Sequence, residues 1–256
     1  MPYQELKDLE LAGVKWELAE IPLTTKTPQQ NKSVPEQKTN NGLNEILKTQ
    51  ASLVPPIAPV QTISIETVRA MASRPTDTNA LLRMITEFNH PLRSNATNTV
   101  LPHIGNGKLM ILTDIPSTDD DASGNILSGN AGDLMDKMLN AIGLNRDNVS
   151  IIPMIFWRTP GGRTPSREEL DMTRPFIEQA IKLIKPTVIL SLGTLPATEM
   201  LNINLAKSHG IPKTMENGAI FVPIYHPNYL ILKPAAKRDV WNALQNVQNI
   251  LKTGEL

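Results

Sequence analysis

Residues 187–202 read TVILSLGTLPATEMLN, and this stretch decides the fold class. The apolar run at residues 188–192 has the length of a buried strand, and Gly193 leads from it into a segment with helical character. The same order recurs along the chain. Further strands are expected at residues 108–114 (KLMILTD), 148–157 (NVSIIPMIFW) and 219–225 (AIFVPIY), and helices at 131–144, 166–185 and 235–251. Alternating strands and helices imply a parallel sheet covered on both faces. We therefore predict an α/β three-layer sandwich around a four-stranded parallel sheet.

The expected helices carry apolar residues at helical spacing. In the helix at 131–144 these residues are Leu134, Met138 and Ile142, and in the last helix they are Val240, Leu244, Val247 and Leu251. The helix at 166–185 opens with a capping box, in which Ser166 is followed three residues later by Glu169.

The N-terminal quarter of the chain has a different composition. Residues 4–20 show the pattern of an amphipathic helix, whereas residues 22–62 are rich in Pro, Thr, Gln and Asn and poor in apolar residues. Such a segment cannot bury enough apolar surface to offset the entropy of ordering. A brief helix at 43–49 interrupts it, and two helices are expected within residues 64–86. We predict an N-terminal helix at 1–21, a disordered linker at 22–62 and a single domain at 63–256.

Composition excludes several kinds of chemistry. The chain of 256 residues has no cysteine, so disulfides, thiolate metal sites and cysteine-ligated clusters are ruled out, and no cofactor is expected. Lys+Arg and Asp+Glu balance at 25 each, but residues 107–150 carry 3 basic and 7 acidic groups and residues 151–256 carry 12 basic and 8 acidic groups. The C-terminal part is therefore mildly cationic, which suits a phosphate backbone. No apolar run resembles a signal peptide or a membrane span, and we expect a cytoplasmic protein without membrane partners.

Polar residues follow each expected strand, at the edge where ligands bind in parallel sheets. His226 follows the fourth strand, and Pro227 holds its backbone extended. Asp114, Pro116, Ser117 and the acidic run at 119–121 follow the first strand, Arg158 and Arg163 follow the second, and Gly193 and Thr194 follow the third. A carboxylate can orient water or stabilise positive charge, a histidine can hydrogen-bond a departing anion, and a helix N-terminus can bind a phosphate.

Each of these features also has an ordinary explanation. A single histidine after a strand is often a loop residue or a core hydrogen-bond donor, an acidic run is often a solvated turn, and a Pro- and Gly-rich loop turns sharply in any protein. From the pattern alone, a catalytic edge and an edge of ordinary loops both remain open, and the substrate is not identified.

Taken together, the segments from about residue 91 to residue 251 resemble the uracil-DNA glycosylase superfamily, and within it the group called family 4. The resemblance is carried by LMILTDIPSTDDD (109–121), GNILSGNAGDLMDKMLNAIGL (124–144), WRTPGGRTPSREEL (157–170), KPTVILSLGTLPATEML (185–201) and YHPNYLILKPAAKRDVW (225–241), in the family's order and spacing. LKDLELAGVKWELAE (6–20) is similar to the N-terminal helix of alphaproteobacterial members.

This resemblance implies hydrolysis of the N-glycosidic bond of uracil, or of a related damaged base, in DNA. The target base must leave the stack for this reaction. By the resemblance, His226 hydrogen-bonds the uracil oxygen as negative charge develops there, and Asp114 and Asp120 are the acidic catalytic residues. Base-binding positions are Ile115, Pro116, Ser117, Leu127 and Pro153. Candidate DNA contacts are Arg158, Arg163, Gly193, Thr194, Lys233 and Lys237, with residues 228–232 (NYLIL) pressing into the DNA. We expect a monomer whose partner is DNA containing uracil or a damaged base.

Several positions depart from the family pattern, and most of them lie in the expected base pocket. Asp114 and Ser117 replace Glu and Gly, Leu127 replaces the Phe on which the uracil ring stacks, and Pro153 replaces the Asn that reads the edge of uracil. The cluster cysteines of many members are also absent, with Trp157 and Thr173 at two of their places. Two functions therefore remain open: a glycosylase with weakened or altered activity, and a non-catalytic protein of this ancestry that binds DNA or a repair partner.

Overall fold

The computed structural model describes residues 63–254, and all the structural findings below refer to this part of the chain. The expected N-terminal helix at 1–21, the linker at 22–62 and the short helix at 43–49 lie outside it. The described residues fall within one unit of the chain, residues 61–256. The division of the whole chain into three segments stays a prediction.

A five-stranded sheet lies at the centre, with the strand order β2-β1-β3-β5-β4. Its strands are β1 (Leu109–Thr113), β2 (Val149–Pro153), β3 (Val188–Leu192), β4 (Lys213–Thr214) and β5 (Ile220–Ile224). The pairs β1–β2, β1–β3 and β3–β5 are parallel, which confirms the four predicted parallel strands. β4 is an additional edge strand, antiparallel to β5. With two exposed residues it was too short to leave a pattern in the sequence.

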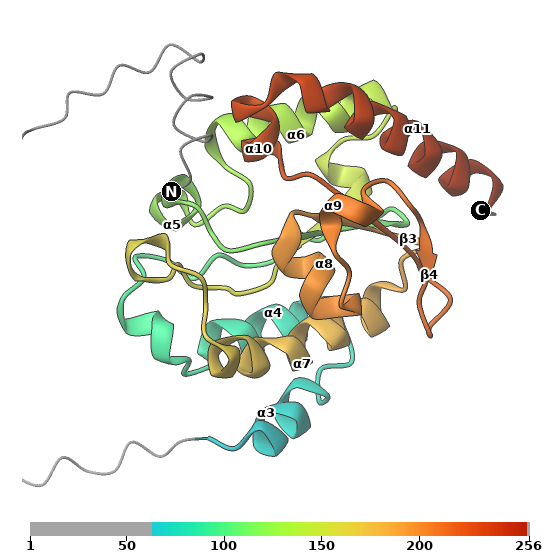
Figure 1. Cartoon of the computed structure of the whole chain (residues 1–256). Helices are drawn as coiled ribbons and strands as arrows, with labels where there is room; N and C mark the ends of the chain where they lie inside the picture. The colour runs from blue at the N-terminus through green and yellow to red at the C-terminus, as the bar shows by residue number, and fades with distance from the viewer. Residues whose placement is uncertain (1–62, 255–256) are drawn as a thin grey trace, which may run out of the picture. The chain divides into compact units, whose positions relative to one another are not determined.

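Helices cover both faces of the sheet (Figure 1). One layer holds α3 (Ile65–Ala72), α4 (Thr78–Glu87), α7 (Arg167–Ile184) and α8 (Thr194–Leu201); the other holds α6 (Gly129–Ala141), α10 (Pro227–Leu232) and α11 (Lys237–Thr253). Successive side chains of a strand point to opposite faces. Met110 and Leu112 therefore pack in the α7 layer, while Leu109 and Ile111 pack in the α6 and α11 layer. This is the predicted three-layer sandwich.

Short elements complete the chain. These are α5 (Thr118–Ser123), α9 (Leu205–Ser208) and the 3-10 turns η1 (Pro91–Ser94), η2 (Arg146–Asn148), η3 (Pro160–Gly162) and η4 (Pro234–Ala236). α5 arises from the acidic run, for which a solvated turn was one open interpretation, and α10 arises from the NYLIL segment. Neither helix was predicted, because six residues hold too few turns to show a period.

One predicted boundary is wrong. The second strand ends at Pro153, four residues before the predicted end at 157, because the chain leaves the sheet there: the Met154 N–H donates to the carbonyls of both Thr113 and Asp114. The face of α6 that carries Leu134, Met138 and Ile142 packs on the core, with Ile142 buried and the other two partly buried. Met135 and Leu139, which the spacing did not single out, are fully buried. The capping box of Ser166 and Glu169 at the start of α7 is present as predicted.

Candidate active site

His226 lies at the carboxyl edge of the sheet, between β5 and α10, with only 9% of its surface exposed. Its backbone is extended (φ −64°, ψ 144°), as expected for a residue before proline. Nδ1 accepts a hydrogen bond from the Asn228 N–H at 3.2 Å, so the imidazole caps α10. On the other side of the ring, Nε2 lies 3.1 Å from Thr113 Oγ1 and 3.5 Å from Asp114 Oδ1. The ring is thus held at both nitrogens.

This hydrogen bonding assigns the tautomer of His226. A ring nitrogen that accepts a backbone N–H carries no proton, so the neutral imidazole holds its proton on Nε2. Nε2 is then a donor that points toward Thr113 and Asp114 at the end of β1. A donor in this place can be redirected to an oxygen that gains negative charge during bond cleavage.

Asp114 faces His226 from the end of β1. Burial raises the pKa of its carboxyl above 3.8, His226 opposes this effect, and the negative charge of Asp120 adds to it. Although 37% of the side-chain surface is exposed, that surface lies within two recesses rather than on an open face. Proximity to His226 and partial desolvation are the properties expected of a carboxylate that acts in catalysis.

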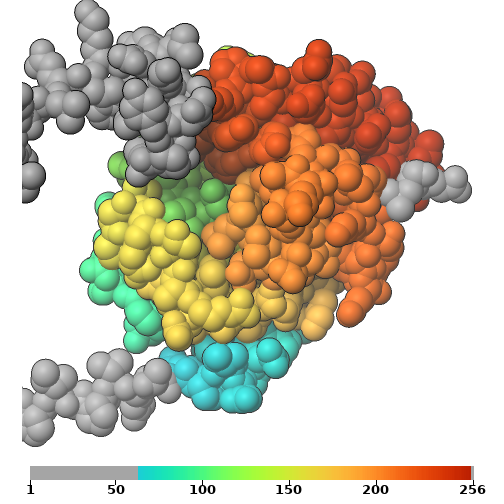
Figure 2. Space-filling view, in the orientation of Figure 1, coloured from blue at the N-terminus to red at the C-terminus, as the bar shows by residue number. Residues whose placement is uncertain are grey.

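Two recesses meet at Asp114 and His226. The smaller, of about 350 Å³, extends toward α5 and the loop after β2. Four of the five predicted base-binding residues line it, namely Ile115, Pro116, Ser117 and Leu127. The fifth, Pro153, is buried at the end of β2 and is not among the lining residues. The larger, of about 690 Å³, extends toward α8 and α9, and in Figure 2 it lies where the yellow and orange segments meet.

Asp120 has a structural set of contacts. It is 5% exposed, and its two carboxylate oxygens accept the N–H groups of Ser117 at 2.9 Å and Ser128 at 2.6 Å. The Ser117 hydroxyl in turn accepts the Asp120 N–H, which completes a capping box at the start of α5. These bonds join two loops that border the smaller recess. They favour a positioning role for Asp120, and its predicted catalytic role stays a prediction.

Arg146 holds the loop that carries Leu127, a role that sequence analysis missed. Its guanidinium donates to the carbonyls of Ile126 at 2.9 Å and Leu127 at 2.7 Å and pairs with Asp136 at 2.9 Å. Leu127 has a positive φ of 51°, a region that costs energy for any residue except glycine. Gly132 allows this loop to approach α6, since a Cβ there would lie 1.8 Å from the Leu127 carbonyl oxygen. No pattern in the sequence linked Arg146 to residues about 20 positions away.

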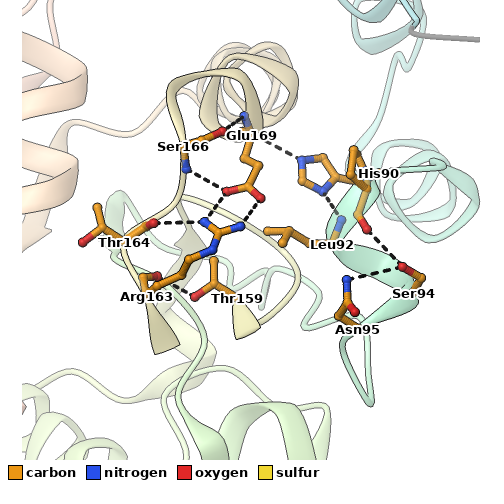
Figure 3. A network of polar contacts seen from close by, with 10 residues as sticks. His90, Leu92, Ser94, Asn95, Thr159, Arg163, Thr164, Ser166 and Glu169 are labelled. Carbon is orange, nitrogen blue, oxygen red and sulfur yellow. Dashed lines mark hydrogen bonds and ion pairs between the residues drawn. The ribbon is translucent and has the colours of Figure 1, made fainter. Parts of the chain in front are cut away.

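The two predicted loop arginines differ in their surroundings. Arg158 lines the smaller recess, donates to the Pro116 carbonyl at 2.9 Å, and has no carboxylate partner among the described residues. Arg163 forms two bonds with Glu169, at 2.8 and 2.6 Å, and lines neither recess (Figure 3). Glu169 also accepts the Ser166 N–H, so Arg163 helps to fix the start of α7. These contacts support a DNA contact for Arg158 better than for Arg163.

The other predicted DNA contacts divide in the same way. Gly193 and Thr194 line the larger recess at the start of α8. Gly193 has φ 92°, a backbone conformation that favours glycine. Lys233 and Lys237 are exposed next to α10 and line neither recess. Their predicted contact with DNA is therefore confined to its backbone.

A metal cluster does not fit the place where many family members carry one. Trp157 is fully buried there, stacks on His90 at 4.9 Å with 9° between the rings, and donates to Thr99 Oγ1 at 2.9 Å. Thr173 donates to the Met154 carbonyl. His90 accepts the Leu92 N–H on Nδ1, and its Nε2 lies 3.2 Å from the carbonyl oxygen of Glu169 (Figure 3). The space is thus filled by packed side chains, and no thiolate exists in the chain to hold iron.

Comparison with known proteins agrees with this architecture and site. A model of the uracil DNA glycosylase superfamily matches residues 102–245, which is more than half of the 256-residue chain. The chain therefore belongs to the uracil DNA glycosylase superfamily.

Within the superfamily, the chain is similar to proteins named type-4 uracil-DNA glycosylase. The protein of Thermotoga maritima is 30% identical over 171 residues, which cover 63% of this chain and 88% of the relative. The protein of Pyrobaculum aerophilum is 31% identical over 161 residues (59% and 80%), and that of Archaeoglobus fulgidus is 28% identical over 159 residues (58% and 79%). In the described part of the chain, no helix combines the length and apolarity needed to cross a membrane.

Proposed function

We propose that this protein is a DNA repair glycosylase that hydrolyses the N-glycosidic bond of uracil, or of a related damaged base, in DNA. The observation that carries the proposal is the placement of His226 Nε2 and Asp114 together on the wall of a recess lined by Ile115, Pro116 and Ser117. Relatives with similar sequences are named type-4 uracil-DNA glycosylase, which supports the same activity.

The geometry suggests a separate role in base release for each of these residues. An extruded base enters the smaller recess with one oxygen toward His226, whose Nε2–H donates to that oxygen as the base departs with the bonding electrons. Asp114 lies beside the histidine, where an ionised carboxylate stabilises positive charge on the sugar or orients the attacking water. Arg158, at the rim, is placed to contact a phosphate of the extruded nucleotide. Action as a cytoplasmic monomer stays a prediction that accompanies this proposal.

The test is base release from a single-stranded oligonucleotide that contains one uracil, compared with the same strand containing only normal bases. We expect release of uracil under single-turnover conditions, with enzyme in excess over DNA, and no release of normal bases. The variant Asp114→Asn with His226→Ala is the matched blank, since a contaminating glycosylase would survive these changes. Release that is equal in the parent and in the blank would contradict the proposal.

A second function is favoured by two substitutions in the expected base pocket. Pro153 takes the place of the family's edge-reading Asn, lies outside the recess and offers no side-chain donor. Leu127 provides an aliphatic contact in place of an aromatic platform. A protein that binds DNA without cleaving it would tolerate both changes. In that case the parent would bind the uracil strand and the normal strand equally and release no base from either.

A further inference from the structure

The larger recess has a wall of aromatic rings. The rings of Tyr225 and Tyr229 lie 4.8 Å apart at 35°, and the ring of His209 lies 4.2 Å from that of Tyr225. Both tyrosines line the recess, and Tyr229 is 42% exposed. Leu195 and Leu205 add aliphatic surface. A flat, apolar ligand in the recess would stack on an aromatic face and would be removed from water.

The polar groups of the recess suit a neutral ligand. No Lys or Arg is found among the described residues that line it. The carboxylate of Glu199 is already paired with Arg167 at 2.9 Å. Gly193, Thr194 and Leu195 at the start of α8 line the recess, and Gly193 supplies no side-chain cap for the first amide groups of this helix. These amides are donors for carbonyl or ring-nitrogen acceptors. Aromatic rings, aliphatic side chains and hydrogen-bond donors thus match an unpaired nucleobase.

The recess is continuous with the reaction centre. Asp114 and His226 line it as well as the smaller recess, so a ligand in one lies beside a ligand in the other. Its volume of about 690 Å³ lies in the range of ordinary ligand sites. If a target base occupies the smaller recess, the adjoining nucleotide of the same strand reaches the larger one.

We propose that the larger recess binds the nucleobase adjacent to the target base, stacked on Tyr229, and that the preferred substrate is therefore single-stranded DNA. This inference rests on the proposed function, since it takes the target base to occupy the smaller recess. In a duplex the neighbouring base is paired and stacked, and moving it into the recess would cost those interactions. In a single strand it is free to stack on an aromatic ring.

The test measures binding rather than cleavage. The probe is a short single strand with a central 2′-fluorinated deoxyuridine, whose glycosidic bond resists hydrolysis. Three further strands lack the base on the 5′ side, the base on the 3′ side, or the uracil itself. We expect Tyr229→Ala to weaken binding of the complete strand about tenfold, the scale of losing one base–aromatic stack. When one of the two neighbouring bases is absent, the same substitution should have no further effect.

Two control variants separate stacking from other causes. Tyr229→Phe keeps the ring and should bind within about twofold of the parent. Trp241→Ala removes an aromatic side chain of similar exposure, 39%, on α11 outside the recess, and should also bind like the parent. In a duplex of the same sequence, the loss caused by Tyr229→Ala should shrink to about twofold or less.

Several outcomes would overturn the inference. One is an equal loss for Tyr229→Ala on all four strands, which would indicate a backbone contact or a folding defect. If Tyr229→Ala has no further effect only on the strand that lacks the uracil, the target base itself occupies the larger recess. An equally large loss in the duplex would refute the preference for single strands. If the parent releases uracil but the effect of Tyr229→Ala does not depend on a neighbouring base, only this inference fails. If the parent neither binds DNA nor releases uracil, the proposed function fails as well.

Discussion

Pro227 fixes the backbone around the histidine at the centre of the site. It holds His226 extended and begins α10, so the imidazole both caps this helix and points Nε2 at the end of β1. The same side chain thus contributes to folding and to the proposed chemistry, and a mutation of His226 has to separate the two.

The substitution His226→Ala should reduce the chemical step about 10²–10³-fold, the scale of losing one donor to a developing negative charge. DNA affinity should hardly change, because this hydrogen bond strengthens only as the base departs. Measurement requires single-turnover uracil release alongside equilibrium binding. His226→Asn is the matched control: Asn retains the ability to cap α10, so it should restore stability without restoring activity. Activity of the Asn variant close to that of the parent would show that the cap alone matters.

A second residue, Asp114, should show opposite effects on stability and activity. Burial raises the pKa of its carboxyl above 3.8, so the unfolded state releases the proton at a lower pH than the folded state does. Stability is therefore lost as the pH rises through the window above 3.8, and the penalty is complete where the folded group is ionised.

Asp114→Asn should accordingly raise the midpoint of thermal unfolding at about pH 7, and the gain should shrink as the pH falls toward 3.8. Uracil release should be strongly reduced at the same time. The exposed Asp133 on α6 provides the control, because Asp133→Asn should alter neither property. A destabilised Asp114→Asn protein at neutral pH would show that the carboxylate is favourably solvated in the fold.

At the scale of elements, the smaller recess is held together by side-chain hydrogen bonds to the backbone of the loop between α5 and α6. Arg146, in η2, bonds two successive carbonyls of the loop between α5 and α6, and Asp120, in α5, bonds the N–H of Ser128 in the same loop. The strained backbone of Leu127 persists because these contacts surround it. The contacts of η2 and α5 with this loop therefore set the shape of the smaller recess.

Arg146→Met should lower the free energy of unfolding by about 1–3 kcal/mol, since two carbonyls lose a charged donor. It should also raise KM for uracil-containing DNA more than it lowers kcat, because Leu127 would no longer be held in the recess. Arg93→Met is a suitable comparison: Arg93 likewise donates to two backbone carbonyls, those of Thr86 and Phe88, but far from the recess. Both variants should lose stability, and only Arg146→Met should change KM. Similar kinetics for the two would refute the positioning role.

At the scale of the whole molecule, the net charge is zero, yet the C-terminal part is cationic. DNA binding should therefore depend on a few local cations and weaken with salt. Arg163 is paired with Glu169, whereas Arg158 has no carboxylate partner within residues 63–254, so Arg158 is the better candidate for a phosphate contact.

Arg158→Ala should weaken DNA binding to a similar extent for all sequences and reduce the salt slope, log K against log[salt], by about one unit. Arg163→Ala should change the slope less and should instead lower stability, because Glu169 loses its partner. Both are measured by titration at several salt concentrations together with thermal unfolding. A full unit of slope lost in Arg163→Ala, with stability intact, would restore Arg163 as the phosphate contact.

The layers of the sheet and helices, the four parallel strands and the edge at which the polar residues gather could all be predicted from the amino-acid sequence. These features depend on hydrophobic periodicity and on the positions of strand ends, and both can be recognised within short stretches of sequence. The strand ends also predicted that His226 and Asp114 lie at the same edge, and the family resemblance predicted the four base-binding positions that line the smaller recess.

The hydrogen-bond and ion-pair partners of the side chains could not be predicted from the sequence and follow from the folded structure. Hydrophobic periodicity does not reveal three such contacts: the hydrogen bond of Arg146 to the Leu127 carbonyl, the ion pair of Arg163 with Glu169, and the ring contact of Tyr225 with Tyr229. The two-residue strand β4 and the six-residue helices α5 and α10 were likewise fixed by pairing and packing. Whether a cation is free for DNA, or a loop is held in a strained conformation, depends on distances of a few ångströms between residues far apart in the chain. Those distances exist only after the chain has folded.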